Sequence, residues 1–264
     1  MEESILRRRL AARRFGGVLY FFDTLSSTND YAKALAAEGA ADGAVVVADS
    51  QSAGRGSGNR RWFSPPRTGI WLSCVQRPSF HPRRIRETGI LAAYSIATIL
   101  REQYAVQVKL KWPNDLVLGG KKTGGLLSEG CAAGNTVSWL VTGLGLNVNA
   151  AAFPPELQHK ATSLFLECGR SFDRGDLIAA YLERLEAEYD RYVTEGSLEH
   201  IIPAYNALLI HQGRFIRLIK PREELLVFSE GINRFGELRV RETGGTIRTL
   251  GIGEISVRGL EGYI

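Results

Sequence analysis

Glycine and arginine alternate in residues 51–66, QSAGRGSGNRRWFSPP, in a pattern that could hold an anion. Gly54, Gly56 and Gly58 would let backbone N–H groups converge on one point. Trp62 could stack on a purine or cover a guanidinium group. The alternative is a flexible surface loop whose tryptophan fills the core. Three arginines could add charge-assisted hydrogen bonds to a phosphate or carboxylate: Arg55, Arg60 and Arg61.

A second polar cluster, KWPND at 111–115, stands at a bend marked by a proline. Asn114 and Asp115 carry oxygen ligands of the kind that Mg²⁺ takes beside nucleotide phosphates. Further on, Lys122 precedes Gly124–Gly125, where missing side chains would let a ligand approach the backbone. A lysine facing a carboxylate and an α-phosphate would stabilise the charge that develops as they join. The alternative for Lys122 is an ordinary lysine on the surface of a hairpin.

Familiar phosphate and metal motifs do not fit this chain. A dinucleotide fingerprint would need glycine at Asn59, and a Walker A loop ending at 120–123 would need glycine at Asp115. The three cysteines form no C-x-x-C, and the four histidines are scattered, which excludes a typical transition-metal site. Cys74 and Cys131 lie among apolar residues, so we expect buried, inert thiols.

The composition is that of a soluble globular protein, with 44% hydrophobic and 23% charged residues in 264. The longest apolar run, 90–100, is too short to span a bilayer, and the N-terminus lacks the apolar core of a signal peptide. We therefore expect a cytoplasmic protein with no membrane contact. The net charge of +5 favours anionic partners. Five arginines between Arg7 and Arg14 predict one solvated helix face, with a nucleic-acid contact as the alternative.

Hydrophobic patterning predicts strands and helices in a mixed order. Strands are expected at 18–23, 43–50, 69–77 and 136–149, a hairpin over 108–130 turning at Gly119–Gly120, and helices over 26–39, 83–104 and 173–193.

The order of these elements predicts an α+β fold in two domains. Several strands are hairpin neighbours without strict βαβ alternation, so we expect a mixed, largely antiparallel sheet with packed helices. From His211 onward only short alternating strands and glycine turns remain, which is typical of a small β-barrel or sandwich. The predicted boundaries are 1–210 for a catalytic domain and 211–264 for the C-terminal domain.

Taken together and in order, these segments resemble biotin protein ligases, also called biotin–acetyl-CoA-carboxylase ligases. The closing GIGEISVR at 251–258 is similar to the end of their small SH3-like C-terminal domain. The resemblance covers the chain from about Val18 to Arg258 and implies a biotin/lipoate ligase fold related to class II synthetases. It is carried by SSTND, ADSQSAGRG, RRWFSPP, GIWLS, KWPNDL, KKTGGLLSE and GLGLNVN.

The resemblance implies a two-step reaction. Family members join biotin to ATP, release pyrophosphate, keep biotinyl-5′-AMP bound, and pass biotin to one lysine of a biotin carboxyl carrier protein or domain. ATP and biotin are the substrates, with Mg²⁺. Carried over by motif, the catalytic residues would be Lys122, Arg55 and Asp115, with Asp115 supporting Mg²⁺. Biotin would be bound by Ser27, Thr28, Asn29, Gln51, Arg55, Gly56, Ser57, Lys122, Gly124, Gly125 and Gly143. The nucleotide would be bound by Arg55, Arg60, Arg61, Trp62, Lys111, Asn114 and Asn147.

The chain departs from the family pattern G-R-G-R-x-G-R-x-W within the loop. Ser57 stands at the second arginine and Asn59 at the following glycine, so the adenylate would be held less firmly unless Arg60 and Arg61 compensate. Some family members carry an additional winged helix-turn-helix. Since 17 residues precede Val18, too few for such a module, we expect the monofunctional form, with no DNA binding and with homodimers possible as in the family.

Two rival functions stay open. A lipoate or octanoate ligase or transferase would share the fold, but the segment 60–71, RRWFSPPRTGIW, lacks the triple glycine and the histidine of those families. A nucleic-acid-binding regulator would explain the arginine cluster and the pI of about 9.2. It lacks a recognisable recognition helix or an aromatic RNA-binding platform.

Overall fold

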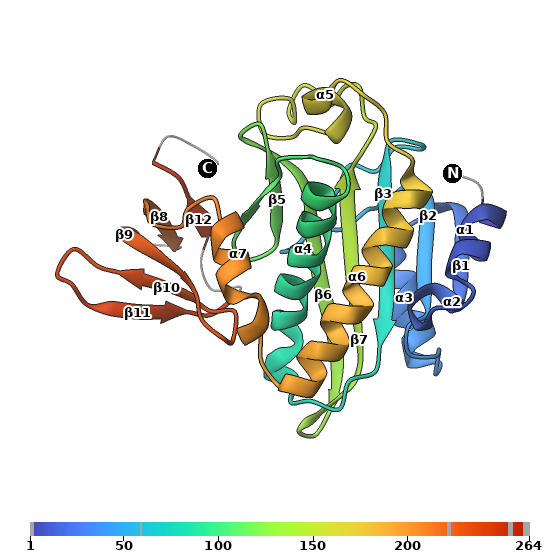
Figure 1. Ribbon diagram of the computed structural model, residues 1–264, viewed down its shortest axis with the longest axis horizontal. Coiled ribbons are helices and arrows are strands. Elements are labelled where there is room, and N and C mark those ends of the chain that lie inside the picture. Colours follow the sequence, from blue (N-terminus) through green and yellow to red (C-terminus); the bar gives the residue numbers. More distant parts are fainter. Residues whose placement is uncertain (1–2, 59, 221–222, 253–255, 261–264) are drawn as a thin grey trace.

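The structure, a computed structural model, describes residues 3–58, 60–220, 223–252 and 256–260, which form two β-sheets (Figure 1). The larger sheet has seven strands in the order β1-β2-β3-β7-β6-β5-β4. The pair β1–β2 is parallel, and the other neighbouring pairs are antiparallel. The predicted mixed, largely antiparallel sheet is therefore confirmed. Its strands are β1 (Leu19–Leu25), β2 (Val45–Gln51), β3 (Gly69–Gln76), β4 (Lys109–Lys111), β5 (Asp115–Leu118), β6 (Lys121–Ala133) and β7 (Thr136–Asn147).

Helices cover both faces of this sheet. The long helices α4 (Ile85–Glu102) and α6 (Arg174–Glu195) lie over one face of the sheet and pack against each other (Figure 1). Helix α3 (Thr28–Ala37) packs on strands β2, β3 and β7. The apolar side chains fall into two buried clusters, a large one that includes α4 and α6 and a small one that includes α3. The sheet therefore separates two cores.

The helix ends follow the capping residues in the sequence. Ser27 caps α3 by accepting a hydrogen bond from the Asp30 N–H, and Asp173 caps α6 in the same way. Gly196 ends α6 with a φ of 71°, a left-handed conformation that suits glycine. The shorter helical segments are η1 (Pro82–Arg84), α5 (Leu164–Cys168), η2 (Glu199–Ile201) and α7 (Ile202–Leu208).

The segment predicted as one hairpin contains three strands. Strands β5 and β6 turn at Gly119 and Gly120, which both have positive φ, as the sequence predicts. Strand β4 pairs with β5 on its other side, and the bend at Pro113 joins them. This bend brings residues 114 and 115 to the start of β5.

The C-terminal sheet is antiparallel, in the order β11-β10-β9-β8-β12. Trp112 Nε1 donates a hydrogen bond of 2.9 Å to the carbonyl of Gly236 in the β9–β10 turn, so this sheet contacts the KWPND bend. Closure into an SH3-like barrel and the boundary at residue 210 stay predictions. The strands are β8 (Phe215–Lys220), β9 (Glu223–Ile232), β10 (Leu238–Arg241), β11 (Ile247–Leu250) and β12 (Ser256–Arg258).

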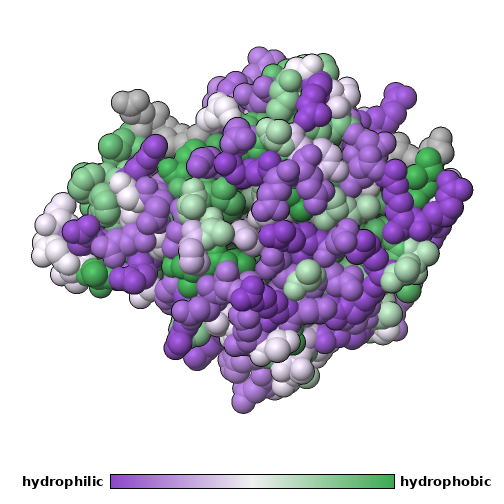
Figure 2. Space-filling view, in the orientation of Figure 1, coloured by the Kyte–Doolittle hydropathy of each residue, from purple (hydrophilic) through white to green (hydrophobic). Residues whose placement is uncertain are grey.

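The N-terminal arginines lie on an exposed helix face that contacts acidic side chains. In α1 (Glu3–Leu10), Leu6 is buried and the arginines are exposed. Arg14, the first residue of α2 (Arg14–Gly17), pairs with Asp190 of α6. The side chain of Arg13 lies 2.8 Å from Glu183, which is also in α6. Figure 2 shows hydrophilic side chains over much of α4 and α6. Four of the five arginines are therefore paired with acidic side chains of the protein: Arg7, Arg9, Arg13 and Arg14.

The expectation for the two cysteines is half correct. Cys74 is buried, and burial raises the pKa of its thiol well above the ordinary value. Cys131 is exposed, so its predicted burial is wrong. The register shifts between Cys131 and Ala132, near the tip of the β6–β7 hairpin, where the strands extend beyond the helices. Among the described residues, no helix is long and apolar enough to cross a membrane.

Candidate active site

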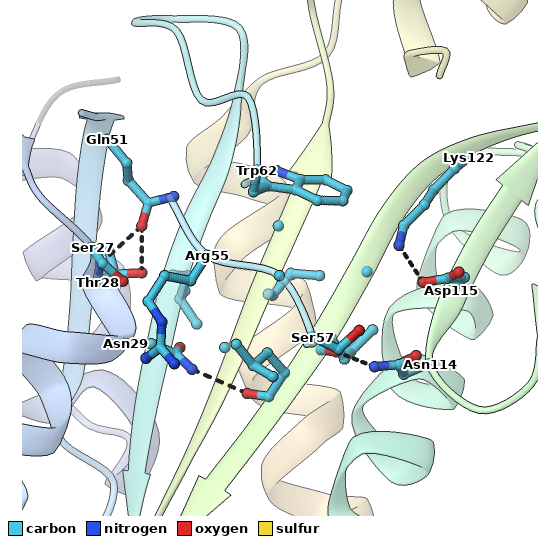
Figure 3. A pocket seen from close by; sticks show the side chains of 18 residues that line it. Ser27, Thr28, Asn29, Gln51, Arg55, Ser57, Trp62, Asn114, Asp115 and Lys122 are labelled. Atoms are coloured by element: carbon cyan, nitrogen blue, oxygen red, sulfur yellow. Dashed lines mark hydrogen bonds and ion pairs between the residues drawn. The ribbon is translucent and has the colours of Figure 1, made fainter. Parts of the chain in front are cut away.

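A pocket lies between the sheet, the start of α3 and the glycine–arginine loop (residues 54–62), as Figure 3 shows. Its volume is about 480 Å³, counting the part that is open to solvent. Segments far apart in sequence meet here. The predicted site residues that line it are Ser27, Thr28, Asn29, Gln51, Arg55, Gly56, Ser57, Trp62, Asn114, Asp115, Lys122, Gly125 and Gly143.

Glycines, which have no side chain, leave space on the face of the sheet beneath the pocket. Gly125 of β6 pairs with Gly145 of β7, and Gly143 lies between Ser73 and Leu127 on the neighbouring strands. A Cβ added to Gly145 would come within 2.8 Å of the indole ring that covers it. Gly143 and Gly145, two positions apart on β7, therefore leave one face of the sheet free of side chains at this point.

Asn29 lies across the gap that Gly143 leaves. Its Oδ1 accepts a hydrogen bond of 2.6 Å from Ser73 Oγ on β3, and its Nδ2 donates to the Leu127 carbonyl on β6. A Cβ on Gly143 would lie 2.0 Å from Asn29 Oδ1. The missing side chain at Gly143 thus makes room for a protein amide at the edge of the pocket.

The polar end of the pocket is a network of short side chains. Gln51 Oε1 accepts a hydrogen bond of 2.9 Å from the Thr28 N–H, and Gln51 Nε2 donates to Ser64 Oγ. Thr28 Oγ1 lies 2.9 Å from Ser73 Oγ. Because these contacts fix both ends of the Gln51 amide, the network presents donors and acceptors in fixed orientations, as recognition of a small polar ring requires.

Lys122 and Asp115 form an ion pair at the other end (Figure 3). Their side chains are 27% and 20% exposed, so the pair is partly shielded from water. Lys122 Nζ also lies 5.2 Å from the centre of the Trp62 ring, within the range of a cation–π contact. A cation is thereby held beside the aromatic wall, where it could contact a bound anion.

The role of Asp115 as a Mg²⁺ ligand stays a prediction. The Lys122 ammonium group already occupies one carboxylate oxygen. The described residues contain no group of three or more His, Cys, Asp or Glu side chains that could hold a metal ion. Since Mg²⁺ is commonly bound by one or two carboxylates plus substrate phosphates, these residues fit Mg²⁺ only as it arrives with ATP.

The glycine–arginine loop is a small hairpin over the pocket. The Gly56 N–H donates to the Arg60 carbonyl at 2.7 Å, and the Trp62 N–H donates to the Gly54 carbonyl at 2.9 Å. Arg60 donates from its side chain to both the carbonyl and the hydroxyl of Ser57. Its guanidinium group therefore lies beside the serine that replaces the family's second arginine. Asn59 lies outside the described residues.

Five predicted residues do not line the pocket. Gly124 points to the core, since an added Cβ would lie 2.7 Å from Leu116. The Asn147 amide is buried and donates to the Thr162 carbonyl, which anchors the segment after β7. Lys111 is 3% exposed, and burial, opposed by the charge of Asp115, lowers its pKa to about 7. The other two are exposed on the loop: Arg60 and Arg61.

Sequence reasoning missed five residues of the sheet that line the pocket. Leucines are common in any core, so no single one signals a site. The alternation of glycine and leucine in GLGLNVN could have indicated Gly145 beside Gly143, because side chains two apart share a face. The missed residues are Leu72, Leu126, Leu127, Leu144 and Gly145.

Comparison with known proteins points to one family. The model of the Biotin/lipoate A/B protein ligase family matches residues 21–147. A Bifunctional ligase/repressor BirA of Bacillus subtilis is 38% identical over 74% of this chain, which spans 61% of that relative's length. A biotin–acetyl-CoA-carboxylase ligase of Paracoccus denitrificans is 32% identical, with 83% of this chain and 92% of the relative covered.

Solved structures agree on the fold. A biotin protein ligase from Aquifex aeolicus, in complex with biotin and ATP, superposes with a TM-score of 0.79 at 24% identity, over 92% of this chain and 99% of that one. The mixed sheet with its packed helices is therefore the fold of biotin protein ligases. The chain belongs to the biotin protein ligase family.

Proposed function

We propose that this protein is an ATP-dependent biotin protein ligase. The observation that carries the proposal is the meeting, in one pocket, of the glycine–arginine loop with the β5–β6 hairpin, which lies far from it in the sequence. The glycine–arginine loop supplies Arg55, the KWPND bend supplies Asp115, and the β6 segment supplies Lys122. Cations and N–H donors predominate there, as the joining of two anions requires.

In the first step, an oxygen of the biotin carboxylate attacks the α-phosphorus of ATP. The bond from that phosphorus to the bridging oxygen breaks, and pyrophosphate leaves with the bonding electron pair. Lys122 would lie between the carboxylate and the α-phosphate and stabilise the charge that develops. Mg²⁺ would arrive with ATP and neutralise phosphate charge.

At the polar end, Ser27, Thr28, Asn29 and Gln51 would bind the ureido ring of biotin. That ring has one acceptor and two donors, and side-chain hydroxyls and amides complement both kinds of group. Leu127, on the same side of β6 as Gly125, would contact the pentanoate chain, which carries no polar atom before its carboxylate. Trp62 would cover the nucleotide end of the pocket, beside Lys122.

In the second step, a lysine amine of a biotin carboxyl carrier domain attacks the acyl carbon of biotinyl-5′-AMP. AMP leaves, the amine loses a proton, and an amide bond remains. No protein nucleophile is required, because the mixed anhydride already contains a good leaving group.

ATP–pyrophosphate exchange on the purified chain tests this function, with biotin, lipoate, octanoate or no acid supplied in parallel. We expect exchange with biotin alone. Exchange with lipoate or octanoate instead would keep the fold and the chemistry but contradict the pocket assignment. The absence of exchange with every acid would contradict the ligase function.

A further inference from the structure

Glu129 of β6 carries a side chain beside the pocket that the proposed reaction does not use. It lies two residues beyond Leu127, which lines the pocket, and so on the same side of the strand. Its side chain is 25% exposed. It contacts Arg55 of the glycine–arginine loop and two residues of α3, and thereby joins three segments of the chain.

Both carboxylate oxygens of Glu129 are fully engaged. Oε1 accepts from Arg55 Nη2 at 3.0 Å and from Lys33 Nζ at 3.3 Å. Oε2 accepts from Arg55 Nη1 at 3.1 Å and from Asn29 Nδ2 at 3.0 Å. The contact with Arg55 is thus a bidentate guanidinium–carboxylate pair, which fixes both the orientation of the guanidinium group and its distance from Glu129.

The charge of Glu129 is maintained by its partners. Partial burial alone would raise the pKa of this carboxyl, but the hydrogen bonds from Asn29 and Arg55 and the nearby cations outweigh it and lower the pKa below its ordinary value. Asp30 adds a second acceptor for Arg55 at 2.6 Å. The arginine is therefore held by two ionised carboxylates from different elements.

The side-chain contact of Arg55 with Glu129 ties the loop to the sheet, whereas the backbone hydrogen bonds from Gly56 to Arg60 and from Trp62 to Gly54 lie within the loop. Gly54 and Gly56 flank Arg55, and glycine loses more conformational freedom on ordering than any other residue. Asn29, the third partner, is the amide that crosses Gly143 at the polar end of the pocket. One carboxylate thus orients both the loop and a pocket residue.

We propose that Glu129 is a positioning residue of the substrate pocket: it holds the glycine–arginine loop over the pocket through Arg55 and fixes the orientation of Asn29. The identity of the substrate, biotin, rests on the proposed function. Glu129 itself touches no reacting atom and acts through its two partners.

Glu129→Gln tests the proposal, because it keeps the shape but removes the charge and places an NH₂ group against donors. We expect biotin affinity, measured by calorimetry, to fall about tenfold or more, since Arg55 and Asn29 lose a charged acceptor. The matched control is Glu230→Gln. Glu230 is 21% exposed and also pairs with two arginines, Arg239 and Arg241, but it lies on β9 of the C-terminal sheet. Its substitution should leave biotin affinity unchanged.

Hydrogen exchange without ligand decides the role independently of biotin. We expect amides of residues 54–62 to exchange faster in Glu129→Gln than in the wild type, with β3 and β7 unchanged. In a double variant with Arg55→Gln, the loop amides should exchange little faster than in Arg55→Gln alone, because both changes break the same contact between Glu129 and Arg55. Unchanged loop exchange, or a lower unfolding midpoint with unchanged biotin affinity, would overturn the proposal. Wild-type protein that fails to bind biotin would contradict the proposed function, and the exchange comparison would still decide the role of Glu129.

Discussion

Two buried tryptophans allow the contact between the sheets to be measured as a free energy. Trp112 and Trp71 are 2% and 1% exposed. Trp112 Nε1 donates to the buried carbonyl of Gly236, whereas Trp71 Nε1 has no hydrogen-bond partner among the described residues. Substitution by phenylalanine removes the same atoms from both residues. The free energy lost through reduced apolar burial and through the cavity left behind is therefore similar in the two variants. The two variants differ in the hydrogen bond that is lost.

Trp112→Phe leaves the Gly236 carbonyl buried without a partner, which costs about 1–3 kcal/mol. Trp71→Phe removes a donor that is already unpaired. We therefore expect Trp112→Phe to lower the free energy of unfolding by about 1–3 kcal/mol more than Trp71→Phe does. Urea unfolding followed by far-UV circular dichroism measures both variants without relying on tryptophan emission. Equal losses in the two variants would refute the claim that this hydrogen bond stabilises the contact between the sheets.

Three further outcomes test the site and the fold. Lys122→Ala should lower the adenylation rate about a hundredfold or more, and a rate near wild type would remove Lys122 from the mechanism. Gly143→Ala should weaken biotin binding about tenfold or more because the new Cβ displaces Asn29. Gly244→Ala, where a Cβ meets open space, should have no effect. Burial raises the pKa of Glu87 from 4.5 to about 7, so the folded state binds its proton more tightly. The free energy of unfolding should therefore fall as pH rises from 4.5 to 7, by at most about 3 kcal/mol, and Glu87→Gln should remove that part of the slope in urea titrations.

Local chemistry in the sequence was enough to predict most elements. Gly119 and Gly120 specify the β5–β6 turn, and Ser27 and Asp173 specify helix starts, because each acts on its own neighbours in the chain. The alternation of short strands after His211 likewise predicted the C-terminal sheet. Where elements begin and end is a short-range property.

The order of motifs also indicated the family, and the structure brings most of the predicted residues into one pocket. It does not do so for Gly124, which faces the core while Gly125 faces the pocket. A strand exposes alternate residues on opposite faces, so one position in register decides which glycine meets a ligand. Composition and motif spacing do not contain that register.

What the sequence by itself determined is the set of elements, the mixed sheet and the residue types that a ligase site requires. Only the tertiary structure decided which side chains meet. Glu129 reaches Arg55 across 74 positions of the chain, and Asn29 reaches the Leu127 carbonyl across 98. Such contacts depend on how strands are ordered in the sheet and on where α3 packs. They are long-range outcomes of folding, and no local pattern in the sequence encodes them.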